Sequence, residues 1–122
     1  MARILVIDDD DEVRRMLKQA LERAGYDVAE AQDSTTGLSE CRSRTIDLVI
    51  TDILLPDHDG TITIRKMMRE FPALKIIAIS GGGDMAGPDS CLNVAKRVGA
   101  QCTFSKPLHI NELLDAVRKL SS

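Results

Sequence analysis

Apolar residues along this chain form short continuous runs, and amphipathic stretches separate the runs. The runs at 3–8 (RILVID), 46–51 (IDLVIT) and 75–80 (KIIAIS) are almost entirely apolar. Such runs are typical of strands in a parallel sheet, because helices cover both faces of that sheet. A shorter run at 101–105 and a more polar one at 26–30 also predict strands, the latter near a sheet edge. The pattern therefore predicts five strands.

The segment 10–24 carries apolar residues at helical spacing, and Gly25 marks the point where this helix ends. The apolar positions are Val13, Met16, Leu17, Ala20, Leu21 and Ala24. Ser34 is the expected N-cap of the next helix. The further helices are expected at 34–44, from the loop at 56–60 to about 70, at 89–98 and at 110–120.

Strand and helix thus alternate five times. Because crossovers between parallel strands are right-handed, we expect an α/β fold, a doubly wound parallel sheet with helices on both faces. Two strand orders are common in such sheets, and the pattern does not choose between them. A length of 122 residues is that of one domain. We expect a single domain over 1–122, with a core at about 3–120.

Composition and charge narrow the possible functions. The net charge is -3, and Tyr26, Phe71 and Phe104 are the only aromatic residues, which counts against direct binding of nucleic acid. No run approaches the roughly 20 apolar residues of a membrane span, and the start does not resemble a signal peptide. We expect a cytoplasmic protein that does not bind membranes.

Three cysteines, Cys41, Cys91 and Cys102, are widely spaced and form no CxxC pair. An odd number without metal-ligand spacing argues against a disulfide framework or a metal site. We interpret them as reduced thiols that act as small apolar side chains.

Polar side chains stand where the predicted strands end. They are Asp8 and Asp9 after the first run, Asp52 after the third, Ser80 after the fourth and Lys106 after the fifth. Ligands of an open parallel sheet bind beyond these carboxyl ends. Crowded carboxylates repel each other unless a cation intervenes, and oxygen ligands at an open edge suit Mg²⁺. With a hydroxyl and an ammonium nearby, the set fits a phosphoryl group, one carboxylate being the nucleophile that forms an aspartyl phosphate.

Simpler interpretations exist for each residue alone. The acidic residues at 8–11 precede a helix, where aspartate is favourable as a cap, so capping and function are equally good readings of that patch. Asp52 is different, because it is followed by Ile53-Leu54-Leu55 and not by a helix start. The convergence of all these residues at successive strand ends favours the functional interpretation.

In this order and spacing, the motifs resemble a bacterial two-component response-regulator receiver domain over about 3–120. The matching motifs are Val6-Ile7-Asp8-Asp9, Thr51-Asp52 with Pro56 and Gly60, Ser80, Gly99-Ala100 and Lys106-Pro107. The resemblance implies a flavodoxin-like (βα)5 fold with strand order 2-1-3-4-5. It also implies a phosphoacceptor signalling domain, not an enzyme, which catalyses only its own phosphorylation and dephosphorylation. Because the chain ends just past its last predicted helix, we also expect no output domain.

The resemblance also implies roles for individual residues. Asp52 would accept a phosphoryl group from a sensor histidine kinase or a histidine phosphotransfer protein. Asp9, Asp52 and the backbone carbonyl of Leu54 would bind Mg²⁺, and Asp8 would help through water. Ser80 and Lys106 would contact the phosphoryl oxygens. The output would be contact with a downstream protein, with a phosphorylation-dependent homodimer as one form.

Some positions depart from the family pattern. Ser80 and the position three residues before the lysine form the family's switch, but the usual aromatic is replaced by Thr103, and the neighbouring Phe104 should face the opposite side of its strand. The glycine-rich segment 81–88 is longer than usual, and we expect phosphorylation to order it. His58 and His109 are expected to be exposed bystanders, and Leu108 replaces an aromatic residue.

Three alternatives remain open. A flavin-binding carrier of the same fold would need a neutral phosphate loop, whereas the residues at 8–11 are all acidic. An aspartyl-phosphate hydrolase would generally carry a second acid where this chain has Leu54. A degenerate receiver would keep the fold but signal without phosphate.

Overall fold

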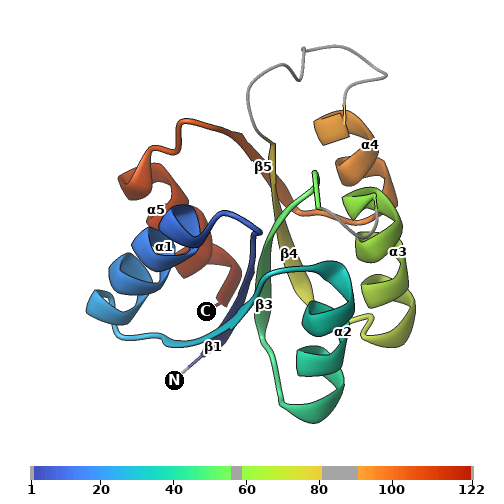
Figure 1. Cartoon of the computed structure of the whole chain (residues 1–122), viewed down its shortest axis with the longest axis horizontal. Coiled ribbons are helices and arrows are strands. Elements are labelled where there is room, and N and C mark those ends of the chain that lie inside the picture. The colour runs from blue at the N-terminus through green and yellow to red at the C-terminus, as the bar shows by residue number, and fades with distance from the viewer. Residues whose placement is uncertain (1, 56–58, 81–90, 122) are drawn as a thin grey trace.

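A five-stranded parallel sheet with the order β2-β1-β3-β4-β5 divides the molecule into two helical layers (Figure 1). The computed structural model describes residues 2–55, 59–80 and 91–121. The strands are β1 Arg3–Ile7, β2 Asp27–Ala31, β3 Leu48–Asp52, β4 Lys75–Ser80 and β5 Cys102–Ser105. The helices are α1 Asp11–Arg23, α2 Ser34–Ser43, α3 Gly60–Glu70, α4 Cys91–Val98 and α5 Ile110–Ser121. The predicted fold class and strand order are confirmed, and β2 lies at an edge as its polar sequence indicated.

Helices α1 and α5 cover one face of the sheet, and α2, α3 and α4 cover the other (Figure 1). Successive side chains of a strand point to opposite faces, so each central strand contributes to both layers. The sheet residues packed with α1 and α5 include Ile4, Val6, Leu48, Ile50, Ile77 and Ile79. This explains why the runs in β1, β3 and β4 are continuously apolar.

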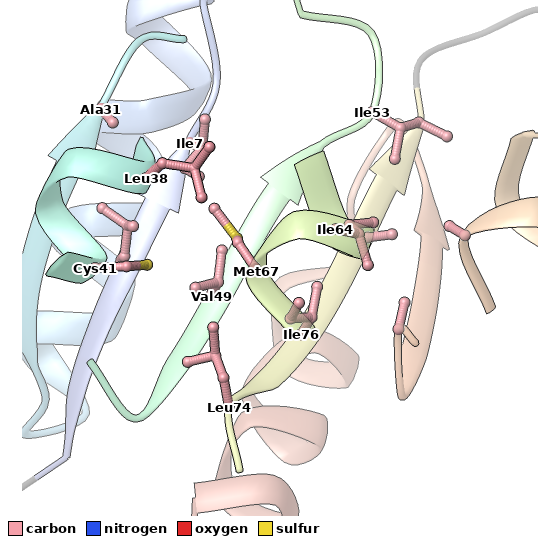
Figure 2. Packing of buried hydrophobic residues seen from close by; sticks show 14 of the residues in the cluster. Ile7, Ala31, Leu38, Cys41, Val49, Ile53, Ile64, Met67, Leu74 and Ile76 are labelled. Atoms are coloured by element: carbon pink, nitrogen blue, oxygen red, sulfur yellow. The ribbon is translucent and has the colours of Figure 1, made fainter. Parts of the chain in front are cut away.

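The second layer is shown in Figure 2. Leu38 and Cys41 of α2 and Met67 of α3 pack toward Ile7 and Val49 of the sheet. Met67 has no exposed surface, and burial of a side chain of this size contributes roughly 1.5–3 kcal/mol. The two layers together hold β1 and β3 in fixed positions, and these strands carry the acidic residues.

Aspartate residues begin the first three helices. Asp10 accepts hydrogen bonds from the backbone N–H groups of Glu12 and Val13 at the start of α1. The prediction that Ser34 caps α2 is wrong, because Asp33 accepts from the N–H of Thr36 while Ser34 is the first helical residue. The two residues are adjacent and both are good caps, so the pattern left the boundary uncertain by one position.

Glycine is required where α3 begins. The N–H of Gly60 donates to the carbonyl of Ile53 at 2.9 Å, and a Cβ at Gly60 would lie 2.3 Å from the Cα of Ile53. This close approach folds the segment after β3 back beside the strand end. The end of α1 also needs glycine, since Gly25 has a φ of 98°, as its predicted role as a helix stop requires.

Among the described residues, no helix is long and apolar enough to span a bilayer. Cys41 is buried and Cys102 is half-buried, and both are free thiols. Burial raises the pKa of the Cys41 thiol to about 11, which suits a small apolar side chain rather than a reactive one. His109 is exposed. The predictions for His58 and for the segment 81–88 fall outside the described residues.

Candidate functional site

Two buried aspartates stand at the carboxyl ends of neighbouring strands. Ile7 is in register with Thr51, so Asp8, which follows β1, and Asp52, which ends β3, lie at the same edge of the sheet. The exposed fraction is 1% for Asp8 and 5% for Asp52. Buried carboxylates are rare unless they are paired or bind a cation, so this pair calls for a positive partner.

Asp9 completes an acidic cluster. Carboxylate oxygens of Asp8, Asp9 and Asp52 all lie within 4.8 Å of one another. Asp9 is exposed, whereas the other two are buried. The cluster is therefore buried against the protein interior at Asp8 and Asp52 and open to solvent at Asp9.

Lys106 supplies a positive charge to the two buried aspartates. Its Nζ donates a hydrogen bond of 2.8 Å to Oδ2 of Asp52 and lies 3.1 Å from Oδ2 of Asp8. The residue comes directly after β5, and its backbone N–H donates to the carbonyl of Ser80 at 2.8 Å. The Lys106–Pro107 peptide bond is cis. The residue after β5 thus places an ammonium beside the carboxylates at the ends of β1 and β3.

Backbone N–H groups fix the other carboxylate oxygens. The N–H of Asp10 donates to Oδ1 of Asp8 at 2.9 Å, and the N–H of Leu54 donates to Oδ1 of Asp52 at 2.8 Å. Oδ2 of Asp8 is buried and accepts no directed hydrogen bond within the described part of the chain; its contact with Lys106 is an ion pair. A buried oxygen with this spare capacity, beside two further carboxylates, fits a hard divalent cation such as Mg²⁺.

The electrostatics of the site follow from burial and crowding. Burial raises the pKa of Asp8, and the nearby Asp52 adds to this, although the Asp10 N–H and Lys106 oppose it. Burial alone would lower the pKa of Lys106, but its contacts with Asp52 and Asp8 outweigh that effect and raise it. The ammonium therefore stays charged, and the raised pKa of Asp8 shows that Lys106 does not fully offset the burial of that carboxylate.

The structure resolves the two interpretations of the acidic patch at 8–11. Asp10 is the cap of α1, and Asp11 pairs with Arg14 at 2.5 Å. Asp8 and Asp9 instead belong to the acidic cluster. Capping and a separate site thus coexist in four consecutive residues.

Ser80 and Thr103 occupy neighbouring strands near this edge. Ser80 is fully buried at the end of β4 and is in register with Ser105, while Thr103 is in register with Ala78. Phe104 packs in the layer of α1 and α5, so Thr103 points to the face that α4 covers. Phe104 therefore stands on the wrong face to replace an aromatic residue at 103.

Sequence reasoning did not identify Arg14 as a neighbour of the site. Its Nη1 donates to the backbone carbonyl of Asp8 at 2.7 Å. The i, i+3 spacing of Asp11 and Arg14 could have suggested a pair on the helix surface. The carbonyl contact depends on how the chain turns between β1 and α1, and no residue pattern carries that information.

Comparisons with known proteins identify the family of this chain. A family model described as the response regulator receiver domain matches residues 4–118. The chain is 34% identical over 121 residues to the response regulator receiver protein CpdR of Brucella abortus, covering 98% of this chain and 97% of that protein. It is 36% identical over 118 residues to the KDP operon transcriptional regulatory protein KdpE of Escherichia coli, covering 97% of this chain but 50% of that one.

A solved structure shows the same arrangement. The CheY-like response regulator receiver domain protein from Methanospirillum hungatei superimposes with a TM-score of 0.89 at 30% identity, covering 98% of this chain and 94% of that one. The similarity therefore extends over nearly the whole of both chains. Sequence and structure thus lead to one conclusion: this chain belongs to the response regulator receiver domain family.

Proposed function

We propose that this receiver domain accepts a phosphoryl group on Asp52, in a reaction that needs Mg²⁺, and signals through a change of conformation. The donor would be a histidine kinase or a histidine phosphotransfer protein. The observation that carries this proposal is the triangle of Asp8, Asp52 and Lys106, in which one ammonium lies within 3.1 Å of both buried carboxylates.

Asp52 is the best nucleophile of the cluster. It ends a strand that is buried along its whole length, and its two oxygens are oriented by the Leu54 N–H and by Lys106. In the transfer, an Asp52 oxygen forms a bond to phosphorus while the bond from phosphorus to the donor histidine nitrogen breaks. The electron pair of that bond stays on the imidazole. Such a transfer requires positioning and neutralisation more than acid–base chemistry.

The donor set suits Mg²⁺. Asp9, Asp52 and the backbone carbonyl of Leu54 would hold the ion, and Asp8 would contact it through water. When bound, the ion neutralises charge on the phosphoryl oxygens and orients them. The support for this assignment is the spare capacity of Asp8 Oδ2 and the close approach of the three carboxylates.

The remaining groups would read the phosphorylated state. Lys106 would exchange its contact with the free carboxylate for a phosphoryl oxygen, and Ser80 would move toward another oxygen. Thr103 lies one strand away on the face of α4, where the family pattern places its second switch residue. Threonine is small and has no aromatic ring that could rotate on phosphorylation. We therefore expect the signal to depend on Ser80 and on the residues that follow it in the sequence.

The domain would act as a phosphoacceptor, catalysing only its own phosphorylation and dephosphorylation. Its output would be contact with a downstream protein or a phosphorylation-dependent homodimer. The two relatives described above are a receiver protein of nearly the same length and an operon regulator about twice as long.

The proposal is tested by incubating the protein with Mg²⁺ and acetyl phosphate and measuring its intact mass. We expect the wild type and Asp115→Asn, which alters an exposed acid on α5, to gain one phosphoryl group. Asp52→Asn should gain none. If the wild type stays unmodified with acetyl phosphate and with candidate kinases, the chain is a degenerate receiver and the proposal fails.

A further inference from the structure

Arg14 connects the segment between β1 and α1 to the edge strand β2. All three guanidinium nitrogens have a partner: Nη1 donates to the carbonyl of Asp8 at 2.7 Å, Nη2 pairs with Asp11 at 2.5 Å and Nε lies 3.3 Å from Glu30. The exposed fraction of the side chain is 16%. Three contacts on three different nitrogens hold the side chain in a single orientation.

The carbonyl that Arg14 binds belongs to the peptide group joining Asp8 to Asp9. Two other contacts restrain the same turn. The N–H of Asp8 donates to the backbone carbonyl of Ala31 at 3.1 Å, and Oδ1 of Asp8 accepts from the backbone N–H of Asp10. Asp9 lies between this peptide and the next one, whose N–H, on Asp10, is held by Asp8 Oδ1. With both planar peptides held, rotation about φ and ψ of Asp9 is restricted, and so is the direction in which its side chain leaves the backbone. Asp9 is the exposed member of the cluster, so its placement depends on its backbone more than on packing.

We propose that Arg14 is a positioning residue for cation binding, holding the Asp8–Asp9 peptide so that Asp9 faces the other two carboxylates. This role rests on the Mg²⁺ site of the proposed function. Arg14 itself does not touch the ion. It acts as the outer partner of a ligand, and loss of such partners typically weakens metal binding roughly 10–100-fold.

A simple charge argument predicts the opposite result. Arg14 is positive, so its removal should strengthen the binding of a dication by relieving repulsion. The positioning role predicts weaker binding, because the freed peptide can turn Asp9 away from the cluster. The direction of the change therefore separates the two explanations without any measurement of phosphorylation.

The test is a Mg²⁺ titration of the full chain followed by amide NMR shifts, at constant ionic strength and without a phosphate donor. Arg14→Ala should raise the Mg²⁺ dissociation constant by about tenfold. Arg14→Lys keeps the charge but cannot reach all three acceptors, so it should fall between the wild type and Arg14→Ala. Lys18→Ala is the matched control: Lys18 also pairs with Glu30, at 3.5 Å, and its variant should stay within about twofold of the wild type.

Each outcome decides the proposal. Weaker binding in both Arg14 variants with an unchanged Lys18→Ala supports it. If Arg14→Ala fails to fold, weaker binding by Arg14→Lys alone still supports it, because charge is conserved there. Unchanged or tighter binding by Arg14→Lys overturns it and leaves the proposed function intact. If the wild type shows no Mg²⁺ response, the metal site and this role both fail, while the mass test of Asp52 remains a separate measurement.

Discussion

Lys106 donates a hydrogen bond to Asp52 although 54 residues separate the two along the chain. The same ammonium compensates Asp8, so a single cation serves two carboxylates that are almost inaccessible to water. Removing one partner of a buried pair is costly, because the remaining charge is left without compensation. The contact therefore links the stability of the sheet edge to the chemistry proposed for it.

Replacing the lysine should damage both properties. We expect Lys106→Met to slow phosphorylation by acetyl phosphate roughly 10²-fold, since it removes a positioned positive group from the transferring phosphoryl. Stability should also fall, by about 1–3 kcal/mol, as measured by urea unfolding. The control is Lys75→Met, which alters an exposed lysine at the start of β4. An unchanged phosphorylation rate would show that Lys106 has no part in the transfer.

Asp8→Asn should stabilise the protein without Mg²⁺, and the gain should depend on pH. The folded-state pKa of Asp8 is raised by burial, so as pH rises past the ordinary value of 3.8 the unfolded chain loses this proton first. Folding stability therefore falls until the pH has passed the folded-state value, and then stays level. Melting curves should show an advantage for Asp8→Asn at neutral pH that shrinks toward pH 4. A constant difference at all pH values would contradict this account.

Mg²⁺ should raise the melting temperature of the wild type. A ligand that binds only the folded state adds about 1.4 kcal/mol at ten times its dissociation constant, which corresponds to roughly 3–6 °C for a domain of this size. Asp9→Asn should lose most of this shift while melting normally without the ion, because Asp9 is exposed. Sodium chloride at equal ionic strength is the control. An equal shift in Asp9→Asn would exclude Asp9 as a ligand.

Gly60→Ala should displace the segment that follows β3. The added Cβ would lie 2.3 Å from the Cα of Ile53, and a rigid backbone cannot yield to it. We expect a loss of about 1–3 kcal/mol together with slower phosphorylation, because Leu54, which orients Asp52, moves with Ile53.

Gly25→Ala serves as the comparison for this variant. Gly25 has open space around the added Cβ but a positive φ, so it should cost about 1–2 kcal/mol and leave phosphorylation unchanged. Equal phosphorylation rates for the two glycine variants would argue against a role for the Ile53–Gly60 contact in shaping the site.

The overall fold was predictable because apolar runs and amphipathic stretches alternate regularly along the whole chain. The apolar runs of β1 and β3 are buried on both faces. Parallel strands end at one edge of their sheet, and from this rule alone Asp8 and Asp52 are expected to lie together. Strand order came only from the family resemblance. Pairing of β1 with both β2 and β3 depends on which crossover returns to which side, and local sequence does not record this.

The sequence pattern could not predict which aspartate caps α1 or which backbone group Arg14 contacts, for a different reason. Four consecutive aspartates look alike in sequence, yet a shift of one residue in the start of α1 decides which of them caps the helix. The same uncertainty of one residue led to Ser34 in place of Asp33. The contact of Arg14 with a main-chain carbonyl was invisible because a carbonyl carries no side-chain signature.

Lys106 follows β5, the strand that comes latest in the chain, and this affects how the protein is made. Ribosomes synthesise β1 and β3, with their aspartates, well before they reach Lys106. A nascent chain that stops short of β5 has the acidic pair but no ammonium to compensate it, so its sheet edge is less stable than that of the finished product. Only a chain translated through its last strand brings the compensating charge, and truncated products should therefore be preferred by cellular proteases.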